Sequence, residues 1–180
     1  MLLDATTAPH SAALHAGYTS TEKMADASLR FLCDVMLARL ARYLRAAGLD
    51  TTLADATAPD AQILRAAIEQ GRWLLTADRG FMLHKAADGH VIQLPFGSLD
   101  AQAAMLNARF RIDWIGRSFT RCLIDNTPLE PAGPELAVQA PQDVRGPGEE
   151  LFTCPACGRV YWKGSHYKRM RHRLEVWQEA

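Results

Sequence analysis

The chain has 180 residues, of which 48% are hydrophobic and 22% charged, and its 20 basic and 20 acidic residues give a formal net charge of zero. This composition is that of a globular protein and argues against a disordered or fibrous one. A neutral chain has no general attraction for polyanions, so any nucleic-acid site must come from an uneven distribution of charge.

The sequence predicts a cytoplasmic protein with no membrane partner. No apolar run approaches the ~20 residues that span a bilayer, and the first residues lack the pattern of a secretory signal. In a reducing compartment the four cysteines are better suited to metal binding, packing or reactive chemistry than to disulfides. Cys33 falls in an expected buried strand and is interpreted as a packing residue.

The predicted elements alternate between strands and helices after an N-terminal extension. Residues 1–29 are rich in Ala, Ser and Thr without a sustained period and are expected to form a mobile extension. Apolar runs predict strands at 30–34, 49–54, 72–78 and 90–95, and helical spacing predicts helices at 34–48, 59–71 and 98–110. This alternation predicts an α/β domain over residues 30–118, a parallel sheet flanked by helices.

Residues 119–180 are expected to form a second, smaller region. Its first half, RCLIDNTPLEPAGPELAVQAPQDVRGPGEE, is rich in Pro and Gly and too poor in apolar residues to build its own core. A small region of this kind usually needs a metal or another staple.

Two short motifs in this region predict a structural zinc site. Cys122 and Asp125 have the same spacing as Cys154 and Cys157, giving C-x-x-D followed by C-x-x-C. Zinc prefers thiolate and imidazole ligands but accepts a carboxylate oxygen, so Asp125 and His166 are rival fourth ligands. A single C-x-x-C can also be an ordinary turn, and Cys122 a small core residue. A redox C-x-x-C is disfavoured because Cys154 does not open a helix after a strand.

Three acids are expected at one edge of the parallel sheet. Asp34 closes the first strand, Asp60 opens the helix after the second, and Asp78 follows the third. Sites in such sheets form beyond the carboxyl ends of the strands. Clustered carboxylates resist ionising together unless a cation lies among them, and magnesium or manganese can there activate water against a phosphodiester. Asp55 and Asp100 are possible further members.

Each acid also has a purely structural explanation. Asp34 and Asp60 sit where a carboxylate caps a helix, and Asp78 sits in a T-A-D-R-G turn, where aspartate is common. Thr76 either orients Asp78 or a water, or is an ordinary strand residue. No phosphate-binding glycine loop, G-x-S-x-G elbow or adjacent acidic pair of a phosphoacceptor domain is present in the sequence.

Taken in order, FLCDVMLARLARYLRAAGLDT, PDAQILRAA, GRWLLTADRG, RCLIDN and CPACGRVYWKGSH resemble the Mut-seven C-terminal RNase family, over about residues 30 to 175. The resemblance implies a PIN-like ribonuclease fold followed by a zinc ribbon, and metal-dependent cleavage of RNA. It places the acidic metal site on Asp34, Asp60 and Asp78 and the ribbon on Cys122, Cys154 and Cys157. The family pattern has a second cysteine where this chain has Asp125.

The C-terminal tail is the predicted RNA-binding surface. Cations interleaved with Tyr161, Trp162 and Tyr167 suit phosphates and unpaired bases, although the same pattern is compatible with a solvated helix face. The expected RNA contacts are Arg159, Lys163, His166, Lys168, Arg169 and Arg171. Arg39, Arg42 and Arg45 on the first helix are possible additions. The leading hypothesis is a metal-dependent ribonuclease, and the alternative is a non-catalytic RNA- or ribosome-binding module.

Overall fold

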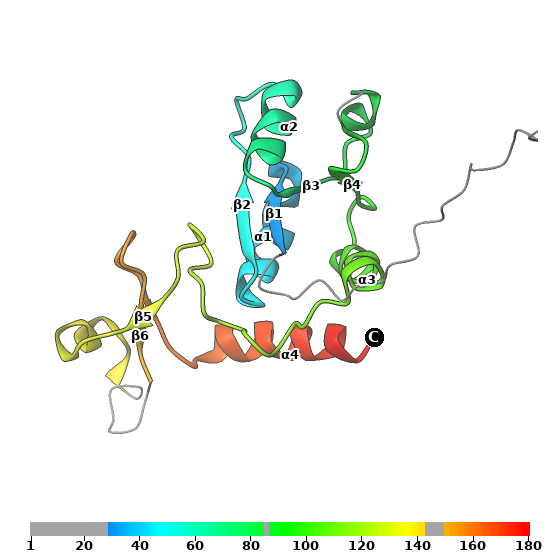
Figure 1. Ribbon diagram of the computed structural model, residues 1–180. Helices are drawn as coiled ribbons and strands as arrows, with labels where there is room; N and C mark the ends of the chain where they lie inside the picture. The colour runs from blue at the N-terminus through cyan, green and yellow to red at the C-terminus, as the bar shows by residue number, and fades with distance from the viewer. Residues whose placement is uncertain (1–28, 85–86, 143–149) are drawn as a thin grey trace, which may run out of the picture.

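The computed structural model describes residues 29–84, 87–142 and 150–180. The predicted N-terminal extension, residues 1–29, lies outside the described residues except for its last position. Figure 1 shows a helix-covered parallel sheet, a small separate β-sheet, and a C-terminal helix that runs from the small sheet beneath the larger one. None of the helices in the described part of the chain combines the length and apolar character that a membrane span needs.

The main sheet has four short parallel strands in the order β2-β1-β3-β4. They are β1 (Arg30–Cys33), β2 (Asp50–Leu53), β3 (Trp73–Thr76) and β4 (Val91–Gln93). All four strands expected from the sequence are confirmed, although each is shorter than its apolar run. Because the strands are parallel, the sheet has one edge where they all begin and one where they all end. We call these the amino edge and the carboxyl edge.

A helix follows each of β1, β2 and β4. These are α1 (Ala38–Ala46), α2 (Asp60–Glu69) and α3 (Leu99–Phe110), as the apolar periodicity predicted. The chain does not enter α1 directly but makes one 3-10 turn at Val35–Leu37. Gly48 follows the end of α1 with φ +86, and a Cβ there would collide with the Arg117 carbonyl, so only glycine fits.

Successive side chains of the strands point to opposite faces of the sheet and fill two cores. Phe31 and Cys33 belong to the larger core with α1 and α3, whereas Leu32 belongs to the smaller core with α2. Cys33 is fully buried, and burial raises the pKa of its thiol to about 12. Its predicted packing role agrees with this environment, since the reactive thiolate is suppressed there.

The C-terminal segment, expected to be a basic tail, forms helix α4 (Ser165–Glu179). Its apolar side chains Met170, Leu174 and Trp177 recur at helical spacing and are buried in the larger core. The Trp177 ring packs edge-on against Tyr43 of α1 and against Trp114, with ring centroids 5.1 and 5.0 Å apart. Helix α4 therefore connects two regions: it follows the small β-sheet in the chain, and its apolar side chains complete the core of the α/β region.

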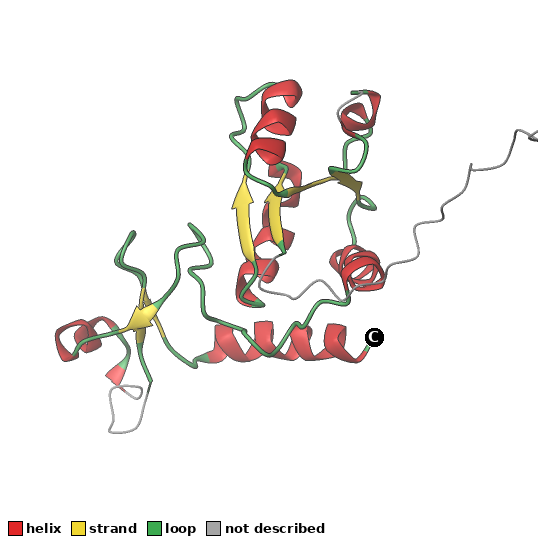
Figure 2. Cartoon of the chain, in the orientation of Figure 1, coloured by secondary structure: helices red, strands yellow, loops and turns green. Residues whose placement is uncertain are grey.

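The region between α3 and α4 holds a second sheet, which has three short strands and is drawn in yellow among loops in Figure 2. Its strands β5 (Glu130–Pro131), β6 (Phe152–Thr153) and β7 (Val160–Tyr161) pair antiparallel in that order. Each strand is two residues long, so this ladder alone supplies few hydrogen bonds. We call residues 119–164 the ribbon.

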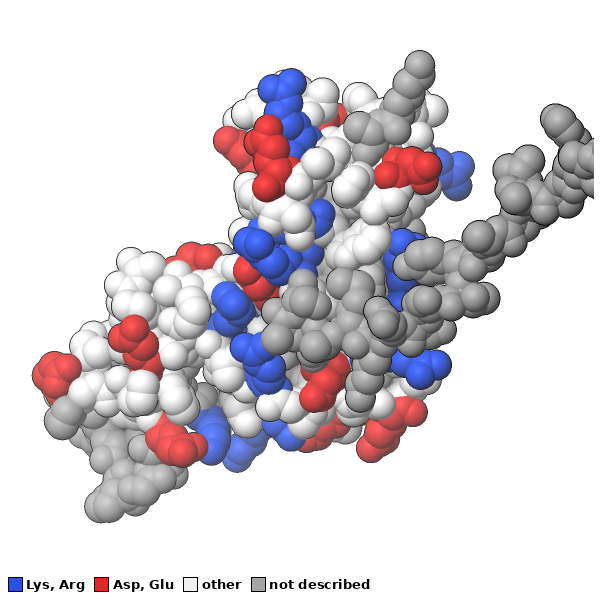
Figure 3. Space-filling model, viewed as in Figure 1, with Lys and Arg blue, Asp and Glu red and all other residues white. Residues whose placement is uncertain are grey.

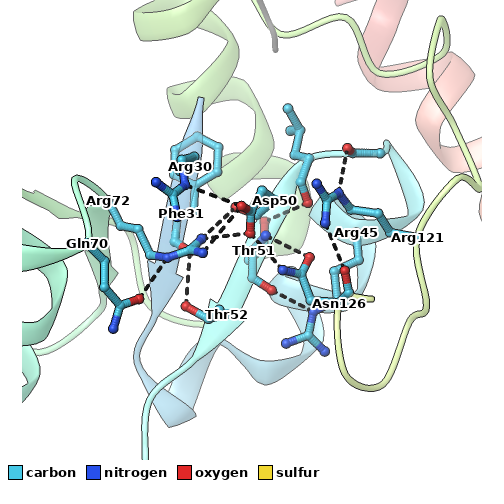
Figure 4. A network of polar contacts seen from close by, with 12 residues as sticks. Arg30, Phe31, Arg45, Asp50, Thr51, Thr52, Gln70, Arg72, Arg121 and Asn126 are labelled. Carbon is cyan, nitrogen blue, oxygen red and sulfur yellow. Dashed lines mark hydrogen bonds and ion pairs between the residues drawn. The ribbon is translucent and has the colours of Figure 1, made fainter. Parts of the chain in front are cut away.

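The ribbon is joined to the amino edge of the main sheet by a polar network, drawn in Figure 4. The Asn126 side chain accepts from the buried Thr51 amide at 2.9 Å and donates to Asp50 at 2.7 Å. Asp50 also forms an ion pair with the buried Arg72 at 2.8 Å. Asn126 has φ +75, a left-handed conformation that asparagine tolerates better than most residues. One side chain thus connects the ribbon to the first residues of β2.

Arg45 makes the second connection. The sequence raised it as a possible addition to the RNA-binding surface, but it is buried, with 5% of its surface exposed. Its guanidinium donates to the carbonyls of Thr51, Leu123 and Ile124 at 2.8, 3.0 and 2.6 Å. Burial lowers the pKa of this arginine from its ordinary value. The suggested contribution of Arg45 to the RNA-binding surface is therefore wrong, because its guanidinium is buried and bonded to backbone carbonyls.

Replacing Asn126 tests this connection. Asn126→Ala removes the acceptor of the buried Thr51 amide. It also places alanine at a positive φ, which alanine tolerates less well than asparagine. An unsatisfied buried donor costs roughly 1–3 kcal/mol and the backbone conformation about 1–2 kcal/mol more. We expect the free energy of unfolding in urea to fall by about 2–5 kcal/mol. Asn126→Gly relieves only the backbone cost and should lie between the two; an alanine variant as stable as the parent would contradict the proposed connection.

Asp50 predicts how stability depends on pH. Burial acts to raise the pKa of this carboxyl, but hydrogen bonds from Arg72 and Asn126 outweigh it and lower the pKa from 3.8 to about 2. The folded pKa is below that of the unfolded chain, so the contribution is complete above about pH 4 and is lost as the pH falls towards 2. Urea titrations across this range should show a steeper loss of stability for the parent than for Asp50→Asn. Equal slopes would contradict the assignment.

Candidate functional site

Two acids at the carboxyl edge of the main sheet, Asp34 and Asp78, are linked through hydrogen bonds to the Thr76 hydroxyl. Asp34 directly follows β1 and is 6% exposed, and its Oδ2 accepts from the Thr76 hydroxyl at 2.9 Å. The same hydroxyl oxygen accepts from the Asp78 amide at 3.0 Å. Asp78 is exposed and accepts from the Gly80 amide at 2.8 Å. Thr76 therefore orients Asp34 and fixes the backbone that carries Asp78; the sequence had raised only the contact with Asp78.

Asp60 is the first residue of α2, after the loop that leaves the carboxyl end of β2. The topology thus brings Asp60 to the same edge as Asp34 and Asp78. Of the two possible additional acids, Asp55 accepts from the amide and the hydroxyl of Thr57 at 2.8 and 2.7 Å, and these bonds lower the pKa of its carboxyl. Its carboxylate is therefore bonded within its own loop.

Asp100 is used elsewhere. It accepts from the Trp177 indole at 2.8 Å and lies 3.8 Å from Arg173, so it holds α4 against the start of α3. Among the described residues, Asp34, Asp60 and Asp78 have no comparable partner side chain, apart from the Thr76 hydroxyl that donates to Asp34.

The spacing of the ligand atoms differs between the two candidate metal centres. Within residues 29–84, 87–142 and 150–180, the metal-type cluster whose ligand atoms all lie within 4.8 Å of one another consists of Cys122, Asp125, Cys154 and Cys157. The acids of the carboxyl edge do not form so tight a group. Magnesium normally keeps several waters and takes only one or two protein carboxylates, so such an ion does not require that compactness.

The Cys122–Asp125–Cys154–Cys157 group, which we call the thiol cluster, has the dimensions of a tetrahedral site. The Cys122 and Cys157 sulfurs are 3.7 Å apart. Two sulfurs on a tetrahedral zinc at ~2.3 Å would be about 3.8 Å apart. The Asp125 oxygens lie 3.4 and 3.5 Å from the Cys154 sulfur. The cluster could therefore hold zinc with three thiolates and one carboxylate.

Tight backbone turns bring these four side chains together. The Cys154 amide donates to Arg159 and the Gly158 amide donates back to Cys154, with Gly158 at φ +71. On the other side, the Asn126 amide donates to the Cys122 carbonyl at 3.1 Å. Cys122 and Cys154 are fully buried, whereas Asp125 and Cys157 face solvent. The two motifs therefore form facing turns, as their equal spacing predicted.

The electrostatics of the cluster favour a cation. The Arg159 amide lowers the pKa of the Cys157 thiol, but desolvation by the facing turn and the nearby Asp125, Cys154 and Cys122 together raise it to about 12. For Asp125, partial burial acts to raise the pKa, yet hydrogen bonds, first of all from the Thr127 amide, hold it well below its usual range. Crowded anionic groups of this kind are stabilised by a divalent ion, which deprotonates coordinating thiols.

Tyr161 is a partner of the cluster that sequence reasoning missed. Its hydroxyl lies 3.1 Å from the Cys122 sulfur and accepts from the Leu123 amide at 3.2 Å. Burial, followed by the neighbouring Cys122, raises the pKa of this hydroxyl, so it keeps its proton and can donate to the sulfur. The only available signal was the aromatic run Y-W after the C-x-x-C-G motif, which was interpreted as RNA-binding.

Four of the six predicted RNA contacts line two hollows. Arg159, Lys163 and His166 line a hollow of about 740 Å³ between the ribbon and α4, and Arg169 lines a second hollow of about 450 Å³ beside α1. His166 borders both, is exposed, lies 3.3 Å from Arg169 through its Nδ1, and does not belong to the thiol cluster. Between the rival fourth ligands, the geometry favours Asp125.

Two predicted RNA contacts line neither hollow. Lys168 is exposed on α4. Arg171 is partly buried, pairs with Glu175 at 2.8 Å and donates to Ser118 at 2.9 Å. Arg171 therefore also holds α4 against the start of the ribbon, which limits its freedom to reach a ligand.

The thiol cluster predicts about one zinc per chain in protein purified without chelators, measured by elemental analysis. Loss of even an outer partner of a metal ligand costs roughly 10–100-fold in affinity, so Asp125→Ala should weaken zinc binding by at least that factor. Asp125→Cys should strengthen it, because thiolate is the preferred ligand. Competition with a chromogenic chelator measures both. His166→Ala is the matched control and should bind zinc as the parent does; zinc loss in His166→Ala but not in Asp125→Ala would refute the assignment.

The family model described as the Mut7-C RNAse domain matches residues 29–174, which include β1, the acids of the carboxyl edge, the thiol cluster and most of α4. No curated protein and no solved structure matches the chain. Because the family model covers well over half of the sequence, the chain belongs to the Mut7-C RNAse domain family.

Proposed function

We propose that the protein is a metal-dependent ribonuclease that hydrolyses RNA phosphodiester bonds. The observation that carries the proposal is the bonded pair of Asp34 and Asp78, joined through Thr76 at the carboxyl edge, in a chain of an RNase family. In this proposal residues 30–118 form a PIN-like nuclease domain and residues 119–180 form a zinc ribbon that assists RNA binding. The proposed location is the cytoplasm, where the four free cysteines would stay reduced.

The catalytic residues in this proposal are Asp34, Asp60 and Asp78. All three offer carboxylate oxygens, the donors that magnesium and manganese prefer. Such an ion, when bound, supplies a Lewis acid that activates water and stabilises charge on the phosphodiester. Thr76 holds Asp34 in one rotamer by donating to Oδ2, which leaves the other carboxylate oxygen available. Asp78, on the exposed side of the edge, is the acid that a substrate reaches first.

The alternative function is a non-catalytic RNA- or ribosome-binding module. It is favoured by one observation: in the described part of the chain, the acids of the carboxyl edge do not form a group within 4.8 Å, whereas the thiol cluster does. In that case Asp34 and Asp78 would serve only to shape the turns after β1 and β3. The two functions share an RNA partner and differ in whether the RNA is cut.

A cleavage assay separates the two functions. Full-length protein should shorten a labelled single-stranded RNA when magnesium is added and leave it intact when magnesium is omitted. Omission is preferable to a chelator, which would also attack the thiol cluster. Asp78→Asn should lower the rate roughly 100-fold or more, the order lost when a group that stabilises transition-state charge is removed. The asparagine oxygen can still accept from Gly80, so the turn is retained.

The matched control is Asp88→Asn. Asp88 is an exposed acid just before β4, at the amino edge, and its replacement should leave the cleavage rate unchanged. RNA binding by Asp78→Asn, measured separately, should persist. If RNA binds but is not cut with magnesium or manganese, the non-catalytic module is the correct function.

A further inference from the structure

We propose that the hollow between the ribbon and α4 is a pocket for an unpaired RNA base, and that the bound strand continues from it along α1 and α4 towards the acids. This deepens the proposed function and rests on RNA being the ligand. We call the larger hollow the base pocket and the smaller one the α1–α4 groove. The two share His166 and Met170, so they adjoin each other on the protein surface.

The base pocket has the size and lining of a ligand site. Its volume of about 740 Å³ lies within the ~300–1,000 Å³ of typical ligand pockets. Five aromatic side chains line it: Phe119, Phe152, Tyr161, Trp162 and Tyr167. All five residues are half-buried, so none of them is fully shielded from solvent. Stacking on such rings is how proteins hold single-stranded nucleic acids with little sequence preference.

Phe119 is held in the pocket by a strained backbone. Its φ is +60, a left-handed conformation that bulky residues rarely adopt. A hydrogen bond of 2.6 Å from its amide to the Ala46 carbonyl, at the end of α1, maintains this conformation. Its ring packs on Tyr167 with centroids 4.3 Å apart and planes tilted by 43°. Strain of this kind concentrates at binding sites, where it fixes a side chain for a ligand.

Trp162 is fixed from the opposite side. A Cβ added to Gly164 would lie 2.6 Å from the Trp162 indole nitrogen, so the ring packs directly over this glycine. Gly164 has an ordinary φ of −80, which means that its requirement is space for the indole and not backbone freedom. Trp162 and the Phe119–Tyr167 pair are thus independently positioned rings in one pocket.

The charge around the pocket suits phosphates. Arg121, Arg159 and Lys163 line it, and Glu150 is the one acid among its lining residues in the described part of the chain. Lys163 pairs with Glu150 at 2.7 Å, whereas Arg159 is exposed and forms no ion pair with any described residue. A local excess of cations in a chain of zero net charge favours a polyanion over an uncharged ligand. Figure 3 shows, on the face in view, Lys and Arg side chains (blue) with some acidic ones (red) near the junction of the ribbon and the α/β region.

The α1–α4 groove gives the strand a route to the acids. Arg39, Arg169 and Arg173 line it with His172, and its one acid among the described residues, Asp100, is already bonded to Trp177. Arg39 lies in the first turn of α1, five residues after Asp34. The groove therefore extends from the pocket to the end of α1 that adjoins the carboxyl edge. An aromatic pocket followed by a cationic groove fits RNA better than an acidic peptide, which would use the charges but not the stacked rings.

The test is RNA binding by the full-length chain carrying Asp78→Asn, so that cleavage does not interfere. Fluorescence anisotropy with a labelled single-stranded RNA in magnesium gives the dissociation constant. Tyr167→Ala should weaken binding roughly ten-fold, the usual loss for one stacked base, while Tyr167→Phe keeps the ring and should bind like the parent. Gly164→Ala, which displaces Trp162 and leaves every charge in place, should also weaken binding. Zinc content and thermal melting confirm that each variant is folded.

Two further arms separate a base pocket from a merely cationic surface. An oligonucleotide of the same length without bases should bind the parent weakly, and Tyr167→Ala should weaken it no further. Arg159→Ala should lower affinity and reduce the salt slope by about one, whereas Arg65→Ala, an exposed cation on α2 across the sheet, should change neither.

The proposal is overturned if Tyr167→Ala binds RNA as tightly as Tyr167→Phe, if the baseless strand competes as well as RNA, or if polyglutamate displaces RNA as effectively as unlabelled RNA. Because every arm measures binding, absence of nuclease activity does not decide it. Conversely, a protein that cuts RNA but shows any of these three results would retain the proposed function and lose the base pocket.

Discussion

The attachment of the ribbon to the amino edge of the sheet depends on buried hydrogen bonds to backbone groups, chiefly those of Arg45 and Asn126. Arg45 donates to carbonyls of β2 and of the Cys122 turn, and Asn126 accepts from the Thr51 amide. Each of these groups would be costly to bury alone, so the turn and the strand stabilise each other. The ribbon strands are too short to supply this order themselves.

The same attachment sets the geometry of the thiol cluster. Cys122 and Asn126 are the ends of one turn, so fixing Asn126 on β2 also fixes where the Cys122 sulfur points. Tyr161 then contacts that sulfur from β7. A metal bound there would link the two motifs of the ribbon to each other, while Arg45 and Asn126 link the ribbon to the main sheet. These two constraints explain how a region with so small a core keeps one orientation relative to the α/β region.

The features that could be predicted from the sequence are those that depend on residues close together along the chain. The strands, α1 to α3 and the thiol cluster are encoded by local patterns: apolar periodicity, Gly48 after α1, and two motifs of equal spacing. The partners of Arg45 lie 78 and 79 residues away along the chain, and no local pattern distinguishes a buried arginine from a solvated one. The same limit applies to Asn126, whose role depends on β2. Met170, Leu174 and Trp177 differ, because they recur at helical spacing, but their segment was interpreted from its basic residues as a tail.

The placement of the ribbon has a consequence for how RNA would be handled. The ribbon joins the amino edge and the acids lie at the carboxyl edge, separated by strands of four residues, about 13 Å long. One nucleotide cannot occupy the base pocket and the acid edge together, so a strand must extend over the α1–α4 groove to reach both. In the proposed binding mode, binding energy gained at the pocket would orient a phosphodiester some nucleotides away and so lower the entropic barrier to cleavage. A short oligonucleotide would gain one contact or the other and a longer single strand would gain both, so this arrangement would favour extended RNA over mononucleotides.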